Sequence, residues 1–424
     1  MRPTMRWPSP SASGRQAGVT SSRRTSRTGS TIVSGGSSPG SSACVLSRPK
    51  TTVRGHPVPD RGPVGFGRRS DAEGAPAGVP VVEGAVLLGD AAAADLLPKR
   101  PERGHKGSFG KLLVLAGSLD YAGAALLVCR AAGRSGVGLV TLAIPESLQP
   151  LFAAKVLEAT TMALPEDDVE EVEPEEALAR ILDHDHDALV VGPGLRPGLA
   201  TRELIAALLA VPEEPTPPPA VLDAEALRSL ASTDRWWAAT RRHAVLTPHA
   251  GEFGRLRAGS GHDPEADGDL VADDAARARV TRAAAEEWGQ VVVLKGARTV
   301  IAAPDGSVAV APFENPAMAS GGTGDVLAGA IGALLAQGLD PFAAARLGVY
   351  LHGLAGEAVR ERIGDAGLLA SDLPDQIAFA RKRLAALAPR SRKPVGFGMR
   401  EIPAPAGSPA AAEASRPPTV GRRS

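Results

Sequence analysis

Aromatic residues and cysteines are scarce in this chain of 424 residues. Only 3% of the residues are Phe, Trp or Tyr whereas 43% are hydrophobic, so the core must consist mainly of aliphatic side chains. The two cysteines, Cys44 and Cys129, are too few for a cysteine metal cluster or a framework of disulfides, and we expect a reducing compartment. No apolar run approaches the roughly eighteen residues of a membrane span. The expected protein is therefore cytoplasmic, without a membrane partner.

Acidic residues are missing from the first 59 positions, which hold eight Arg and one Lys. Residues 391–424 carry a net charge of +4 and the whole chain is neutral, so residues 60–390 carry −13. An acidic body argues against nucleic acid as a partner. Residues 1–80 are rich in Ser, Gly, Arg and Pro, and we expect them, like residues 391–424, to form a disordered tail. An organelle transit peptide or an upstream start of the reading frame are the alternatives for the first segment.

Between the tails, residues 81–390 alternate apolar runs of strand length with helical patterns. This alternation predicts an α/β domain with a mostly parallel central sheet and helices on both faces. Strands are expected at residues 111–116, 137–144, 188–191, 220–223, 244–247 and 291–294, and the main helices at 122–133, 323–337 and 341–362. Residues 299–303 and 308–311 flank a Pro-Asp-Gly-Ser turn and predict a late antiparallel hairpin.

Glycine-rich turns lie where the predicted strands end. Ligands of an open parallel sheet bind beyond the carboxyl ends of its strands. We therefore expect one crevice, formed by residues 117–124, 192–194, Asp223, 249–252, 295–299 and 320–325. Two familiar nucleotide motifs do not fit. Residues 107–111 lack the spacing of a phosphate loop, and residues 117–123 lack the dinucleotide glycine pattern.

The segment SGGTGDVLAG, residues 320–329, is the strongest candidate for chemistry. It places Gly321, Gly322 and Gly324 just before Asp325, at the start of a predicted helix. Successive backbone N–H groups and the positive end of the helix dipole bind anions, commonly phosphate. A helix cap alone would explain the aspartate, but it needs none of these glycines. We interpret Asp325 as a functional acid.

Two further polar clusters are interpreted as structural. The acidic run at residues 166–176 is expected to be a solvated loop or helix start. The segment His184-Asp-His-Asp187 has the residue types of a metal site, but it precedes its strand and lies away from the expected crevice. We expect a solvated connection there, and assign no metal ligand.

Six segments taken together resemble a known family. In order they are KGSFGKLLVLAGS with YAGAA, VVGPGL, VLDAEAL, LTPHAGE, LKGARTV and SGGTGDVLAG. They resemble the ADP-dependent NAD(P)H-hydrate dehydratases of the ribokinase-like superfamily, over residues 90–388. The resemblance implies a ribokinase-like three-layer α/β/α sandwich and a hydro-lyase. Its substrate would be the S epimer of NADHX or NADPHX, with ADP as co-substrate, Mg²⁺ as cofactor, and NAD(P)H, AMP and phosphate as products.

The resemblance also implies partners. Family members are often homotetramers, so a homotetramer is expected. The epimerase domain often fused to this domain has no counterpart in residues 1–80, so a separate NAD(P)HX epimerase is expected to act in the same pathway.

Site residues follow from the same resemblance. Asp325 is expected to contact the hydrated nicotinamide and to serve as the base. The nucleotide is expected at Lys295, Gly296, Ala297, Arg298, Thr299 and Gly324, with Lys295 or Arg298 adding positive charge. The other substrate contacts implied are Ala124, Gly194 and His249, although His249 also suits a helix cap. The family loop usually reads GPGLG, and in this chain Arg196 takes the place of the last glycine.

The proposed chemistry is phosphorylation of the C6 hydroxyl followed by loss of phosphate. A free aspartate, with a pKa of about 3.9, is a weak base at neutral pH, so the expected contribution of Asp325 is geometric. Two alternatives remain open. One is a ribokinase-like kinase of a small vitamin precursor, and the other is a non-catalytic nucleotide sensor, which would not need Asp325. Composition does not decide between ADP and ATP.

Overall fold

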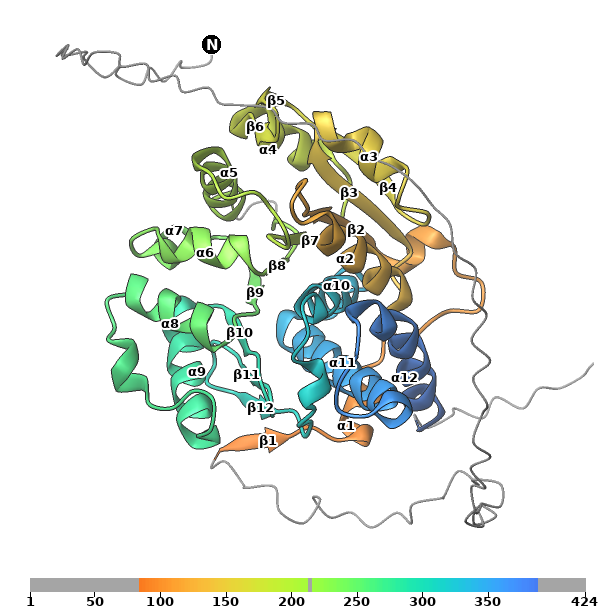
Figure 1. Ribbon diagram of the computed structural model, residues 1–424, viewed down its shortest axis with the longest axis vertical. Helices are drawn as coiled ribbons and strands as arrows, with labels where there is room; N and C mark the ends of the chain where they lie inside the picture. Colours follow the sequence, from red (N-terminus) through yellow and green to blue (C-terminus); the bar gives the residue numbers. More distant parts are fainter. Residues whose placement is uncertain (1–83, 213–215, 388–424) are drawn as a thin grey trace, which may run out of the picture. The chain divides into compact units, whose positions relative to one another are not determined.

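The computed structural model describes residues 84–212 and 216–387, so the tails expected at residues 1–80 and 391–424 lie outside the described residues. The strands are β1 (Ala85–Leu87), β2 (Lys111–Leu115), β3 (Leu139–Pro145), β4 (Thr160–Leu164), β5 (Glu166–Asp168), β6 (Glu171–Val172), β7 (Ala188–Val191), β8 (Ala220–Leu222), β9 (Ala244–Leu246), β10 (Val291–Leu294), β11 (Val300–Ala302) and β12 (Val308–Val310). Ten of them form one sheet in the order β1-β12-β11-β10-β9-β8-β7-β2-β3-β4 (Figure 1). Only β11 runs against its neighbours, β10 and β12. The mostly parallel sheet and the late hairpin are thereby confirmed.

Helices cover both faces of this sheet. They are α1 (Asp90–Asp95), α2 (Ala122–Arg134), α3 (Gln149–Ala153), α4 (Pro174–Asp183), α5 (Leu199–Leu209), α6 (Glu225–Ala231), α7 (Trp236–Ala239), α8 (Ala250–Gly259), α9 (Asp274–Trp288), α10 (Thr323–Ala336), α11 (Pro341–Ile363) and α12 (Leu373–Leu387). Helices α4 to α9 pack on one face, and α1 to α3 with α10 to α12 pack on the other (Figure 1). The three-layer prediction is confirmed.

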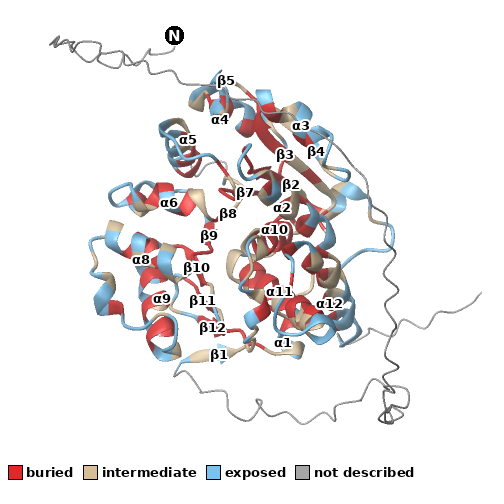
Figure 2. Cartoon of the chain, viewed as in Figure 1, coloured by how far each residue is buried: buried red, intermediate tan, exposed pale blue. Residues whose placement is uncertain are grey.

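Strand side chains alternate between these two helical layers. On β2, Leu112 and Val114 belong to one core cluster, whereas Leu113 and Leu115 belong to the other. Buried residues follow the sheet and the inner sides of the helices, while the outer sides are exposed (Figure 2). A parallel strand buried on both faces reads as a continuous apolar run, which is why the sequence shows these strands clearly.

Helix α10 lies against α2 at close range because both present small residues. A methyl group on Gly329 would lie 2.4 Å from the carbonyl oxygen of Val128, so a larger residue would separate the helices. This packing holds the N-terminus of α10 next to the start of α2.

Two expectations were wrong in part. The acidic run is not only a solvated loop, because it contains the β5–β6 hairpin, and Glu170 accepts a 2.6 Å hydrogen bond from the backbone N–H of Leu119. The connection before β7, residues 184–187, precedes its strand as expected and is not fully solvated. His186 is buried there, with its Nδ1 2.6 Å from the carbonyl oxygen of His184. One helix that was not predicted from the sequence, α12, packs on α2 and α11.

Candidate active site

An ion pair lies where β8 and β10 end. Asp223 follows β8 and is buried, and Lys295 follows β10 with its ammonium 2.7 Å from Oδ1 of Asp223. The hydroxyl of Thr247, after β9, donates to the same oxygen at 2.8 Å. Three neighbouring parallel strands therefore deliver these groups to one edge of the sheet. The sequence placed Asp223 in the crevice but assigned it no role.

The first turn of α10 lies beside this ion pair. Gly322 is the N-cap with φ of 90°, a left-handed conformation that favours glycine, and Asp325 is in the first turn rather than at the cap. A methyl group on Gly324 would lie 3.3 Å from Nζ of Lys295 and 3.8 Å from Oδ2 of Asp223. The first N–H groups of a helix have no acceptor inside it, so this turn offers donors to an anion next to the lysine.

The ionisation of Asp325 is strongly perturbed in this setting. Burial is the main cause and Asp223 adds to it, while Lys295 opposes them, and the pKa of Asp325 rises from 3.8 to about 7. For Lys295, burial lowers the pKa, but Asp223, Glu252 and Asp325 outweigh it and raise the pKa above its ordinary value. A carboxyl group with a pKa near neutrality both accepts and releases a proton at physiological pH. The expectation of a weak base, taken from a free aspartate, does not hold in the fold.

A cavity of about 530 Å³ opens next to the ion pair. Of the nucleotide positions expected from the sequence, five line it: Lys295, Gly296, Ala297, Thr299 and Gly324. Its apolar wall includes Phe313, Met318, Leu327 and Val349. A small pocket with an apolar wall and a few polar groups at one end suits a planar base carrying phosphates.

Arg298 differs from the other residues of its loop because it does not line this cavity. Its guanidinium lies 2.8 Å from a carboxylate oxygen of Asp274 and 3.5 Å from one of Glu314. Its charge is therefore already paired within the protein. Of the two cations expected near the phosphates, only Lys295 lines the cavity.

His352 also lines the cavity, although it was not among the site residues predicted from the sequence. This partly buried residue of α11 donates from Nε2 to the carbonyl oxygen of Thr323 at 2.9 Å. Burial lowers the pKa of His352 to about 4, so the ring is neutral and can keep this single donor. This hydrogen bond connects α11 to the first turn of α10. The only signal in the sequence was a histidine within a largely apolar helical run.

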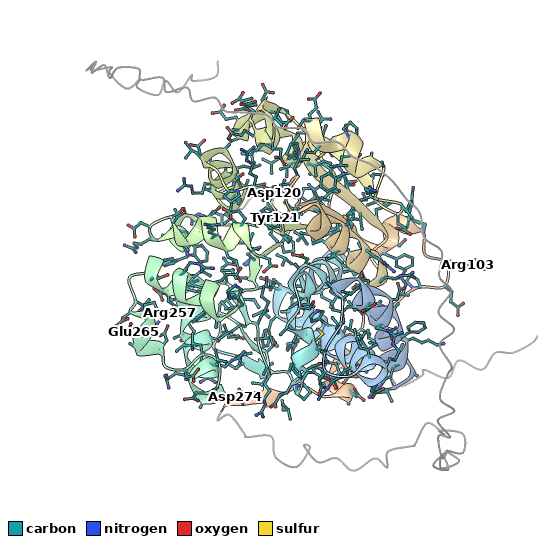
Figure 3. All side chains as sticks on the ribbon, in the orientation of Figure 1. Arg103, Asp120, Tyr121, Arg257, Glu265 and Asp274 are labelled. Atoms are coloured by element: carbon teal, nitrogen blue, oxygen red, sulfur yellow. The ribbon has the colours of Figure 1, made fainter. Side chains whose placement is uncertain are left out.

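Two of the expected substrate positions meet at the start of α2. Gly194 has φ of 66°, and a methyl group there would lie 2.8 Å from Cβ of Ala124 and 2.7 Å from the carbonyl oxygen of Tyr121. Tyr121 lies in the loop that precedes α2 (Figure 3). The neighbouring Gly192 approaches Asp223, because a methyl group on Gly192 would lie 1.9 Å from the Asp223 carbonyl oxygen. The GPG loop thus packs between the start of α2 and the backbone of Asp223.

His249 is the N-cap of α8 and also lies near the lysine. Its Nδ1 accepts from the backbone N–H groups of Gly251 and Glu252 at 3.0 and 3.3 Å, and the Glu252 carboxylate accepts from its backbone N–H. Because Nδ1 is an acceptor, the neutral ring carries its proton on Nε2. The side chain is 56% exposed, and Glu252 lies 3.8 Å from Nζ of Lys295. The capping reading is correct, and the exposed Nε2–H remains a donor.

Arg196 points to the β5–β6 hairpin. Its guanidinium donates to the carbonyl oxygen of Val169 at 3.2 Å and lies 3.8 Å from Glu170. The side chain that replaces the family glycine is therefore bonded to an acidic turn.

Among residues 84–212 and 216–387, no group of three or more His, Cys, Asp or Glu side chains is arranged to hold a metal ion. The site nevertheless has three carboxylates around one ammonium, and an anionic nucleotide would add more negative charge. Such a charge balance fits Mg²⁺ held mainly by phosphate oxygens and water with one carboxylate. Asp223 is suited to hold the ion. Thr247 and Lys295 both donate to its Oδ1, and its Oδ2 lies on the side of Gly324.

Comparison with known proteins agrees with this geometry. Residues 112–378 match a family model described as NAD(P)H-hydrate dehydratase. The bifunctional NAD(P)H-hydrate repair enzyme of Moorella thermoacetica is 40% identical over 290 residues, 68% of this chain and 52% of that protein. The ADP-dependent (S)-NAD(P)H-hydrate dehydratase of Neisseria meningitidis serogroup B is 36% identical over 289 residues, 67% of this chain and 89% of that protein.

A solved structure is similar as well. The ADP/ATP-dependent NAD(P)H-hydrate dehydratase from Bacillus subtilis, co-crystallised with ATP and Mg²⁺, matches with a TM-score of 0.59 at 32% identity, covering 71% of this chain and 99% of that one. The chain spans about half the length of the bifunctional relatives it matches.

Proposed function

The chain belongs to the NAD(P)H-hydrate dehydratase family, with a ribokinase-like fold, and from this premise we propose that it dehydrates the S epimer of NADHX and NADPHX at the expense of ADP. The observation that carries the proposal is the position of Asp325. It lies in the first turn of α10, beside Lys295 and Asp223 and with a pKa of about 7, next to a cavity of about 530 Å³.

The proposed reaction has two steps. In the first, Asp325 accepts the proton of the C6 hydroxyl, the hydroxyl oxygen forms a bond to the β-phosphorus of ADP, and AMP leaves. In the second, the C6–O bond breaks with phosphate as the leaving group while the ring nitrogen donates its lone pair. Loss of the C5 proton then restores the dihydronicotinamide. Phosphorylation is needed because hydroxide is a poor leaving group.

Residues of this chain supply position and charge for the transfer. The backbone N–H groups of Gly324 and Asp325 and the ammonium of Lys295 would face the transferring phosphoryl group, where charge stabilisation supplies most of the rate. Mg²⁺ would be held by Asp223 with the phosphates, and would neutralise charge on the phosphate oxygens. We assign the nucleotide to Lys295–Thr299 and Gly324, with Arg298 contributing its backbone, and the nicotinamide to Ala124, Gly194, His249 and Asp325.

The remaining proposals concern the surroundings of the enzyme. We propose a homotetramer, a separate epimerase that supplies the S epimer, ADP in preference to ATP, and a cytoplasmic location. No helix within the described ranges is long and apolar enough to cross a membrane.

Incubation with acid-hydrated NADH tests the proposal. With ADP and Mg²⁺ the absorbance of the reduced nicotinamide should return, and ATP in place of ADP measures the preference. Asp325→Asn should lower turnover by about 10³-fold, within the range of general-base catalysis, while ADP still binds. Absence of any return in the wild-type chain, or near-normal turnover in Asp325→Asn, would contradict it. A stable phosphorylated product would instead indicate the kinase.

A further inference from the structure

We propose that Arg277 of α9 is a positioning residue, which holds the nucleotide loop at residues 295–299 in its binding shape. The inference rests on the proposed nucleotide site. Arg277 does not line the cavity, and it is 1% exposed, beneath the loop. It acts through the backbone carbonyls of Leu294, which comes just before the loop, and of Ala297, which lines the cavity.

The guanidinium of Arg277 bonds the loop at both ends of its turn. Nη2 donates to the carbonyl oxygen of Leu294 at 3.0 Å, and Nη1 donates to that of Ala297 at 2.8 Å. The planar fork of arginine is suited to hold two acceptors in a fixed relation. These two peptide groups come immediately before Lys295 and Arg298.

Each of these peptide groups is held on its other side as well. A trans peptide is planar, so its C=O and the following N–H point in opposite directions. The N–H of Lys295 donates to the carbonyl oxygen of Pro248 at 2.8 Å, and the N–H of Arg298 donates to that of Phe313 at 2.8 Å. Arg277 therefore fixes two peptide planes that tie the loop to both neighbouring segments of the site.

The loop has a backbone shape that requires such support. Gly296 has φ of 149°, and a methyl group there would lie 2.8 Å from Nη1 of Arg277. Arg298 has φ of 52°, a left-handed conformation that costs on the order of 1 kcal/mol or more in a residue other than glycine. Its side chain is held by Asp274, one turn before Arg277, at the N-terminal end of α9 (Figure 3). The first two turns of α9 thus contact the loop twice, because Arg277 binds two of its backbone carbonyls and Asp274 binds the side chain of Arg298.

Removal of the guanidinium would leave the two carbonyl oxygens without their donor and let the loop leave its strained shape. Lys295, placed by this loop, would then lose its fixed position against Asp223. The effect should therefore appear mainly in nucleotide binding. Chemistry at saturating nucleotide should suffer less, because bound ADP itself holds the loop.

A second buried arginine provides the control. Arg242 is also 1% exposed, and its guanidinium donates to two backbone carbonyls, those of Leu208 and Pro218. It precedes β9, at the amino edge of the sheet, opposite the site. Arg242→Met and Arg277→Met thus remove comparable buried hydrogen bonds, and only the second removes them from the nucleotide loop.

The experiment measures the Kd of ADP by calorimetry without substrate, the Tm, and the KM for ADP and kcat where turnover occurs. We expect Arg277→Met to raise the Kd and KM for ADP by about tenfold or more, with kcat within about threefold, and Arg242→Met to lower the Tm with the Kd unchanged. Arg277→Lys keeps the charge without the fork and should give a smaller rise. If Arg277→Met does not fold, Arg277→Lys is used as the test variant in the same measurements.

Two results would overturn the inference. One is an ADP Kd within twofold of the wild type in the folded Arg277 variant, and the other is an equal rise in Arg242→Met. Wild-type protein that binds ADP but does not dehydrate the hydrate would refute the proposed function alone. Wild-type protein that does not bind ADP would refute both.

Discussion

The reaction rate should fall steeply as the pH drops below neutrality, because Asp325 must be ionised to accept the hydroxyl proton. Burial first, and then Asp223, raise its pKa from 3.8 to about 7. With this pKa, about 90% of the carboxyl groups are ionised at pH 8 and about 3% at pH 5.5, so kcat/KM should fall about 30-fold. An aspartate with the ordinary pKa of about 3.9 would be nearly fully ionised at both, and would give a flat profile.

The assay is kcat/KM for hydrated NADH between pH 5.5 and 9, read from the returning absorbance, since kcat/KM reports the ionisation of the free enzyme. The terminal phosphate of ADP also titrates near pH 6, so the protein's contribution needs a control. Asp223→Asn removes a negative charge next to Asp325, and should move the acid limb to lower pH whatever its effect on the maximal rate. A flat wild-type profile, or a limb at the same pH in both proteins, would refute the reasoning.

Two further predictions separate structural from functional roles. His249→Asn retains a side-chain acceptor for the N-cap of α8, whereas His249→Ala should lower the free energy of unfolding by about 1 kcal/mol. Urea denaturation measures this difference in stability. Both variants should also raise the KM for the substrate, because both lack the imidazole. An unchanged KM in both variants would show that His249 is not part of the substrate site. Gly324→Ala places a methyl group 3.3 Å from Nζ of Lys295, and should raise the KM for ADP severalfold with little change in Tm. Gly332→Ala, on the same helix, would instead bring a methyl group to 2.3 Å from Val190 Cγ2 in the core, and should lower stability by about 1–3 kcal/mol with the KM unchanged; the opposite pattern would contradict both assignments.

Much of the fold could be predicted because its central strands are buried on both faces. β2, β7 and β10 are continuous apolar runs that end at glycine or lysine turns, so their ends and the crevice could be located from local sequence. The short elements could not. β1 and β6 have three and two residues, and they are strands only because a neighbouring strand pairs with them. The amphipathic α12 was missed as a separate element.

The candidate site divides in the same way. Residue type and order alone determined the glycine-rich turn before Asp325, the lysine loop and the GPG loop, because each is a local solution to a close backbone approach. Only the tertiary structure decided the charge state of Asp325, since its pKa depends first on burial and then on Asp223 and Lys295, which are distant in sequence and act through space. Arg277 lies within an ordinary amphipathic helix pattern, and its partners become visible only after folding. A pKa depends on burial and on the charges within a few ångströms, and sequence separation carries no information about either.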